Sequence, residues 1–80
     1  MPRYHFNLHE HGKVVADEPG RDYDDLPAVR AAAVEAARDL MSHEVRQGSL
    51  SLSSCIVVED DSGAEVLRVP FGSAITVTGR

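Results

Sequence analysis

The segment Leu26–Gln47 constrains the fold of this chain more than any other part of the sequence. Asp25 is of a residue type that caps helix N-termini, Pro27 fits the first helical turn, and Gly48 is a common stop after the last turn. Between these signals, apolar residues recur with helical spacing along one side: Leu26, Val29, Ala33, Ala37, Leu40 and Met41, flanked by Val34 and Val45. The pattern predicts one long helix with one buried face, whose small alanines let the helix lie close to a sheet.

Short strand patterns lie on both sides of this segment. Arg3–His9 alternates apolar and polar residues with a period of two, and Val14–Val15 follows a polar turn, so this end of the chain predicts a β-hairpin. Cys55–Glu59 and Glu65–Phe71 are separated by a turn sequence and predict a second hairpin. Ile75–Thr78 is interpreted as either a brief fifth strand or a tail.

The order of these elements is ββαββ, which predicts an α+β fold. We expect an antiparallel sheet of four or five strands with the long helix packed across one face. Eighty residues fit one domain and only just suffice to bury a core, so residues 1–80 are expected to form a single domain. Only four residues are aromatic, and a core this thin favours self-association.

Charge, cysteine content and hydropathy exclude several classes of protein. Thirteen acidic residues against eight basic ones give a net charge of −5, which disfavours binding to nucleic acid. Cys55 is the single cysteine and has no intrachain disulfide partner, which is typical of a reducing compartment. No apolar run approaches the roughly 20 residues of a membrane span, and no signal peptide is recognisable. We therefore expect a cytoplasmic protein without membrane contact, and its bias toward Arg and Ala indicates a bacterial origin.

Side chains with catalytic or metal-binding chemistry are few. His9 and His11 lie two residues apart, about 6.6 Å in an extended strand, so they could share one metal ion. No third ligand accompanies them, and we predict no dedicated metal site. The acidic loop Asp17–Asp25 lacks the spacing of a calcium loop, and no nucleophile or nucleotide motif occurs. These observations predict a protein without enzymatic activity, cofactor or small-molecule ligand.

A set of short motifs is spread over nearly the whole chain. They are Met1-Pro2-Arg3-Tyr4-x-Phe6-x-Leu8, Asp17-Glu18-x-Gly20, the Ala-spaced helix, Asp61-x-Gly63 and Val69-Pro70-Phe71. Together they resemble a family of small domains of unknown function found mostly in soil and plant-associated alphaproteobacteria, in which the fifth position is usually aromatic where this chain has His5. The resemblance implies a fold and no activity. The order of strands, acidic turn and Ala-rich helix is also similar to small antitoxin domains of the HicB type.

These features predict a non-enzymatic protein-interaction or regulatory module that acts through protein contacts as a homodimer. If the larger apolar residues of the last strand face the helix, three apolar side chains remain on the opposite face of the sheet: Cys55, Val57 and Val66. A second copy of the chain would cover this patch, or would pair with an edge strand extended by Ile75 and Val77.

Two alternatives stay open at this point. The first is an antitoxin-like domain that binds a basic partner protein through its acidic loop. The second is a metal-dependent enzyme that uses His9 and His11.

Overall fold

The middle of the chain forms the expected helix. In the computed structural model, which describes residues 2–79, α1 spans Leu26–Arg46 and ends one residue before its predicted end. The Asp25 carboxylate accepts a hydrogen bond from the Ala28 N–H at 2.9 Å, and Pro27 lies in the first turn. Gly48 takes a left-handed conformation with φ of 88°, which stops the helix. Both predicted caps are confirmed.

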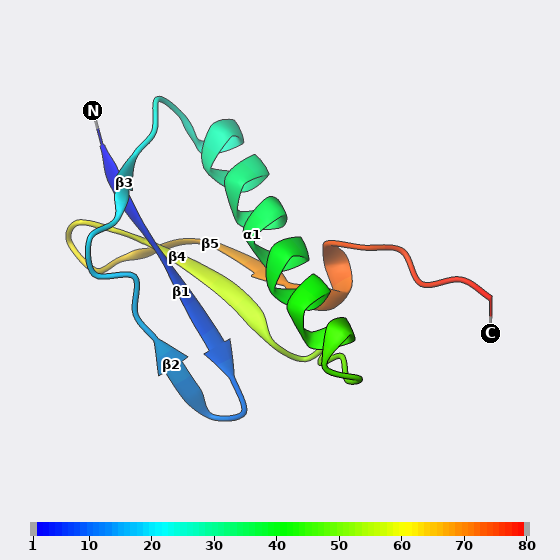
Figure 1. Ribbon diagram of the computed structural model, residues 1–80. Helices are drawn as coiled ribbons and strands as arrows, with labels where there is room; N and C mark the ends of the chain where they lie inside the picture. Colours follow the sequence, from blue (N-terminus) through cyan, green and yellow to red (C-terminus); the bar gives the residue numbers. More distant parts are fainter. Residues whose placement is uncertain (1, 80) are drawn as a thin grey trace.

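One antiparallel sheet lies behind α1 (Figure 1). Within the described residues it has five strands: β1 (Arg3–Glu10), β2 (Lys13–Val15), β3 (Arg21–Asp22), β4 (Cys55–Asp60) and β5 (Glu65–Pro70). The strand order is β2-β1-β4-β5, and β3 pairs with the beginning of β1. The predicted α+β class, with one helix on one face of an antiparallel sheet, is confirmed.

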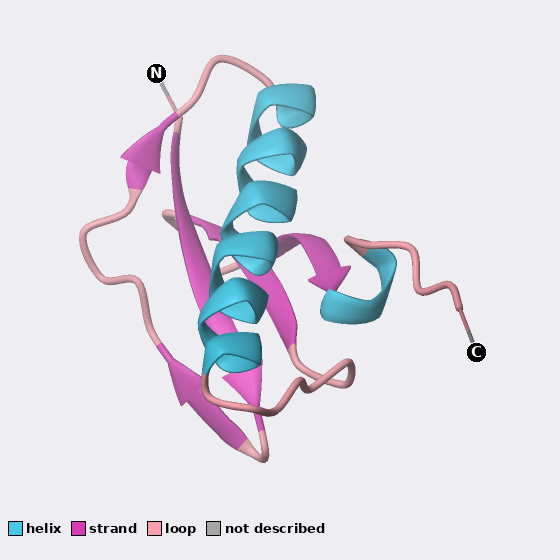
Figure 2. Cartoon of the chain, turned by 45° about the vertical axis from the view of Figure 1, so that its right-hand side comes forward, coloured by secondary structure: helices cyan, strands magenta, loops and turns pink. Residues whose placement is uncertain are grey.

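The fifth strand is not where its sequence pattern suggested. Ile75–Thr78 forms no strand; the chain leaves β5 through the short 3₁₀ helix η1 (Phe71–Ser73) and then runs away from the sheet (Figures 1 and 2). The alternative interpretation, a tail, is the correct one. The additional strand is β3, inside the acidic loop, where two residues pair with Arg3 and Tyr4. A two-residue strand is too short to show alternation, so periodicity cannot reveal it.

The core lies between α1 and the sheet. The helix buries Val29, Ala33, Ala37 and Met41 against Ile56, Val58, Val69 and Phe71, while Val34 and Leu40 are half-buried. Leu26 and Val45, which were predicted within or beside the buried stripe, are 51% and 59% exposed. The two residues lie in the first and last turns of α1, away from the buried residues in the middle of the helix.

Two local irregularities shape the strands. The β1–β2 hairpin turns through His11 and Gly12, whose φ angles of 49° and 76° are those of a type I′ turn. Between β4 and β5 the register shifts at Val58/Glu59, which leaves Val66 as the extra residue of a β-bulge. As a result, Glu65 and Arg68 lie on the same face of the sheet.

Candidate functional site

The face of the sheet opposite α1 carries three rows of side chains. Cross-strand pairing aligns His9 with Cys55 and Pro70, Asn7 with Val57 and Arg68, and His5 with Glu59 and Glu65. This is the face on which an apolar patch for a second copy was predicted. Most of the aligned side chains are polar.

The predicted patch is not exposed. Cys55 and Val57 lie on this face as expected, but they are only 8% and 2% exposed. The Arg68 guanidinium extends over β4 and donates to the Cys55 Sγ at 3.5 Å, while the Glu65 carboxylate holds it at 2.9 Å. Val66 is half-buried and packs against the core because of the bulge. The expectation of an exposed apolar face is therefore wrong, because polar side chains of the same chain cover its centre.

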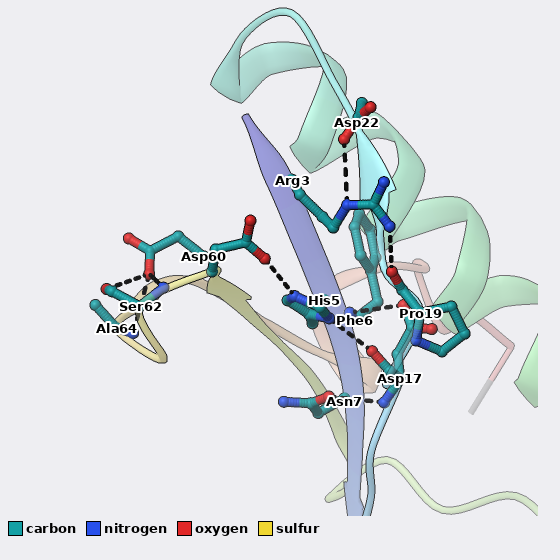
Figure 3. A network of polar contacts seen from close by, with 11 residues as sticks. Arg3, His5, Phe6, Asn7, Asp17, Pro19, Asp22, Asp60, Ser62 and Ala64 are labelled. Atoms are coloured by element: carbon teal, nitrogen blue, oxygen red, sulfur yellow. Dashed lines mark hydrogen bonds and ion pairs between the residues drawn. The ribbon is translucent and has the colours of Figure 1, made fainter. Parts of the chain in front are cut away.

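The loop between β2 and β3 is tied to β1 by a network of hydrogen bonds (Figure 3). The Phe6 N–H donates to the Asp17 carboxylate at 3.1 Å, and the Asp17 N–H donates to the Asn7 side-chain oxygen at 2.9 Å. His5 extends the network in two directions. Its Nδ1 lies 2.8 Å from the Asp17 carbonyl oxygen, and its Nε2 lies 2.9 Å from an Asp61 carboxylate oxygen in the β4–β5 turn.

The two contacts of His5 favour its charged form. Both partner atoms are hydrogen-bond acceptors, and only the protonated imidazole carries an N–H on each ring nitrogen. The hydrogen bond to the Asp61 carboxylate, followed by that to the Asp17 carbonyl, raises the pKa of His5 above its ordinary value. His5 therefore links two loops that are distant in the sequence, and its protonated form makes this link strongest.

The absence of a side chain at Gly20 leaves room for the His5 ring. Its φ is 67°, and a Cβ at this position would lie 2.8 Å from both the His5 ring and the Tyr4 carbonyl oxygen. The same loop is held a second time where Arg3 donates to the Pro19 carbonyl at 2.6 Å. Glycine is thus required here both for the backbone conformation and for the close approach of the ring.

An acidic hollow of about 320 Å³ lies beside His5. Five carboxylates line it: Asp17, Glu18, Glu59, Asp60 and Asp61. Asp60 is engaged in its own turn, where hydrogen bonds from Ser62 and from the Ala64 N–H lower its pKa. The Asn7 side chain is buried, and its amide nitrogen makes no hydrogen bond with residues 2–79; in Figure 3 it points away from Asp17.

His9 and His11 line a different hollow of about 340 Å³, together with Cys55 and Arg68. In the described part of the chain, no three His, Cys, Asp or Glu side chains are grouped so that they could hold a metal ion. His11 occupies a position of the tight turn at the far end of the hairpin. The prediction that the two histidines form no dedicated metal site stays a prediction.

On one flank of the helix, the exposed Val45 and the half-buried Val34 line two surface hollows, whereas the exposed Leu26 lines neither. Two hollows of about 380 and 630 Å³ meet at Arg38 and form what we call the α1 groove. Its apolar lining consists of Ala31, Val34, Met41, Val45, Leu50 and Ile75. Its charged lining consists of Arg30, Glu35, Arg38 and Arg46. Figure 2 shows η1 beside the C-terminal half of α1. The Arg38 Nε donates a hydrogen bond to the Ala74 carbonyl oxygen, directly after η1, at 2.8 Å.

The α1 groove cannot be recognised from helical periodicity. Helical periodicity places Val34 and Val45 beside the buried stripe and does not show whether another segment lies next to them. The groove arises because η1 turns the chain back toward the helix, so that Ile75 and Val45, thirty positions apart, line the same hollow. The only local signal was the presence of arginines within an otherwise apolar flank.

These features define an α+β domain in which polar contacts close one face of the sheet and a helix with an apolar flank covers the other. A family model described as "Domain of unknown function (DUF6894)" matches residues 3–72, from the start of β1 into η1. The chain belongs to this family, and the match leaves out the segment that follows η1. No curated protein and no solved structure matches the chain. Among residues 2–79, no helix combines the length and apolar character needed to cross a membrane.

Proposed function

We propose that this chain is a non-enzymatic protein-interaction module of the bacterial cytoplasm and that the α1 groove is its binding surface. The observation that supports this function is the position of the exposed apolar side chains. Val45 and Leu50 are 59% and 41% exposed and line the groove beside Ile75. Contiguous exposed apolar surface of this kind marks sites of protein contact.

The titratable groups support a module rather than an enzyme. Each group with a shifted pKa is engaged in a hydrogen bond with another residue of the same chain. The Arg68 guanidinium lowers the pKa of Glu65 along β5, and Asp61 raises the pKa of His5. His5 and Asp60 line the same hollow, but each is engaged there by residues of its own chain, His5 by Asp61 and Asp60 by Ser62.

The experiment is affinity capture from the native host with three forms of the protein. We expect the wild type to retain a partner and Val45→Glu to lose it, because a charge replaces an apolar contact in the groove. Val14→Glu is the matched control, since Val14 is equally exposed at 58% but lies on β2. Equal retention by all three forms would exclude the groove as the binding surface.

We also propose that the chain forms a homodimer through the edge of β5. Among residues 2–79, β5 has a neighbour on only one side, which is β4. If β5 pairs antiparallel with a second copy about an axis between Val66 and Leu67, Glu65 comes opposite the partner's Arg68, and the reverse pair forms by symmetry. This self-complementary charge pattern favours the edge over the polar face of the sheet.

Light scattering on a size-exclusion column tests this proposal. We expect a mass near twice 8.7 kDa at micromolar concentrations. Arg68→Glu should shift the protein toward the monomer, and Glu65→Arg combined with Arg68→Glu should restore the dimer. A monomer at every concentration would contradict dimer formation, and a dimer unaffected by Arg68→Glu would contradict the edge of β5.

A second candidate function is the binding of a basic partner protein, as in the antitoxin-like alternative. The acidic hollow favours it, because Glu18 and Glu59 line this hollow and have no hydrogen-bond or ion-pair partner among the described residues. An Arg-rich peptide should bind the wild type and lose affinity to the Glu18→Gln, Glu59→Gln double variant. If the double variant binds the peptide as tightly as the wild type, the hollow is not the site.

A further inference from the structure

We infer that the partner segment that occupies the α1 groove is an acidic amphipathic helix. This inference rests on the proposed function and names the chemistry of its partner. It follows from the charge of the groove, from the spacing of its lining residues and from its length.

The charge of the groove is opposite to that of the whole chain. Three arginines and one glutamate line it, while the chain carries a net charge of −5. Arg30 and Arg46 make no hydrogen bond or ion pair with residues 2–79, and Arg38 contacts only the Ala74 carbonyl oxygen there. A second copy docked groove to groove would bring six arginines together, so like charges disfavour this occupant. Carboxylates on the occupant would pair with the arginines.

The spacing of the lining residues fits a helix. On α1 they recur at intervals of three and four residues: Ala31, Val34, Arg38, Met41 and Val45. Such rows form a ridge into which the side chains of a second helix pack, and a groove of this kind recognises the apolar face of an amphipathic helix. The groove follows α1 from Pro27 to Val45, about 27 Å at 1.5 Å per residue, which a partner helix of about 18 residues would fill.

The test uses two synthetic peptides of about 18 residues, a length chosen to match the groove. Both have the same Leu and Ala face, and the flanking positions are Glu in one and Lys in the other. Fluorescence anisotropy with the full chain measures their binding. We expect the Glu peptide to bind the wild type, and Arg30→Gln with Arg46→Gln to weaken this binding about tenfold.

Arg21→Gln, on the exposed strand β3, is the control and should leave the binding of the Glu peptide unchanged. Added salt should weaken Glu-peptide binding to the wild type more than to the double variant.

The inference is overturned if the Glu peptide does not bind or if the double variant binds it as tightly as the wild type. Circular dichroism establishes that the variants are folded, and both substituted arginines are exposed and make no contact that the fold needs. Failure of the Glu peptide while Val45→Glu still abolishes capture of the host partner would mean that the occupant has another chemistry. If Val45→Glu also leaves capture unchanged, the proposed function itself fails.

Discussion

His5 joins the loop after β2 to the β4–β5 turn, and its charge makes this link sensitive to pH. Because its pKa is raised in the folded protein above the ordinary value of 6.5, protonated His5 stabilises the fold below that value. The contribution is lost as the pH rises through the raised pKa. We therefore expect the urea concentration at the midpoint of unfolding to decrease as the pH is raised from about 6 to about 8, the range in which histidine titrates.

His5→Phe should remove this part of the pH dependence while keeping a ring over Gly20. His43→Gln, on the helix, is the matched control and should retain the slope of the wild type. Identical slopes for the wild type and His5→Phe would show that the two hydrogen bonds of His5 do not discriminate between its protonation states.

Gly20→Ala tests the close approach of the loop to β1. An alanine in the left-handed region costs about 1–2 kcal/mol. Gly63 also has a positive φ, of 86°, but a Cβ added there would have no other atom within 4 Å, so Gly63→Ala should cost no more than this. At Gly20 the new methyl group must also displace the His5 ring or the Tyr4 carbonyl, so the loss of unfolding free energy should be clearly larger. Equal losses in chemical denaturation would contradict the packing of the ring on Gly20.

Sequence alternation correctly placed His5 on the polar side of its strand but could not identify its partners. Asp17 lies 12 positions away and Asp61 lies 56 positions away. Both belong to turns, where composition indicates a loop without fixing its path. The same limit explains why Cys55 and Val57 were expected to be exposed, since their cover depends on the direction that the Arg68 side chain takes.

At the scale of elements, the fit between α1 and the sheet depends on alanine. Ala33 and Ala37 are fully buried and belong to the core between α1 and the sheet. Ala33→Leu should destabilise the protein by about 1–3 kcal/mol through overpacking. Ala31→Leu, one helix face away and exposed, should change the free energy of unfolding by less than about 0.5 kcal/mol. Thermal or urea unfolding of the two variants compares them directly, and similar stabilities would mean that the helix can move away from the sheet at little cost.

The elements that could be predicted are those with local signals. The helix ends are encoded by Asp25 and Gly48, and both hairpins by turn residues between apolar runs, so α1, β1, β4 and β5 were found nearly to the residue. β3 has no such signal. Its pairing with β1 depends on the hydrogen bond between Asp17 and Phe6, which holds the loop against β1. The exposure of Leu26 in the first turn of α1 has no signal in the helical periodicity either.

For the whole molecule, the segment after η1 marks the limit of the folding unit. Phe71 is fully buried, whereas residues 76–79 lie outside the core and outside the family match. Deletion of residues 76–80 should leave the free energy of unfolding within about 0.5 kcal/mol of the wild type. Deletion of residues 71–80 should abolish cooperative unfolding, because loss of a buried Phe alone costs about 3–5 kcal/mol. A strongly destabilised 76–80 deletion would mean that the tail belongs to the core.

The position of β1 in the sheet determines when this protein can fold. β1 is made first, yet its main partner is β4, so that Tyr4 pairs with Asp60 across most of the chain. During synthesis the N-terminal hairpin must therefore remain without its neighbour until almost the entire domain has left the ribosome. Such long-range closure slows folding relative to a helical protein of the same size. It also means that the sheet cannot be completed before β4 and β5 have been made, whereas α1 precedes both of these strands in the chain.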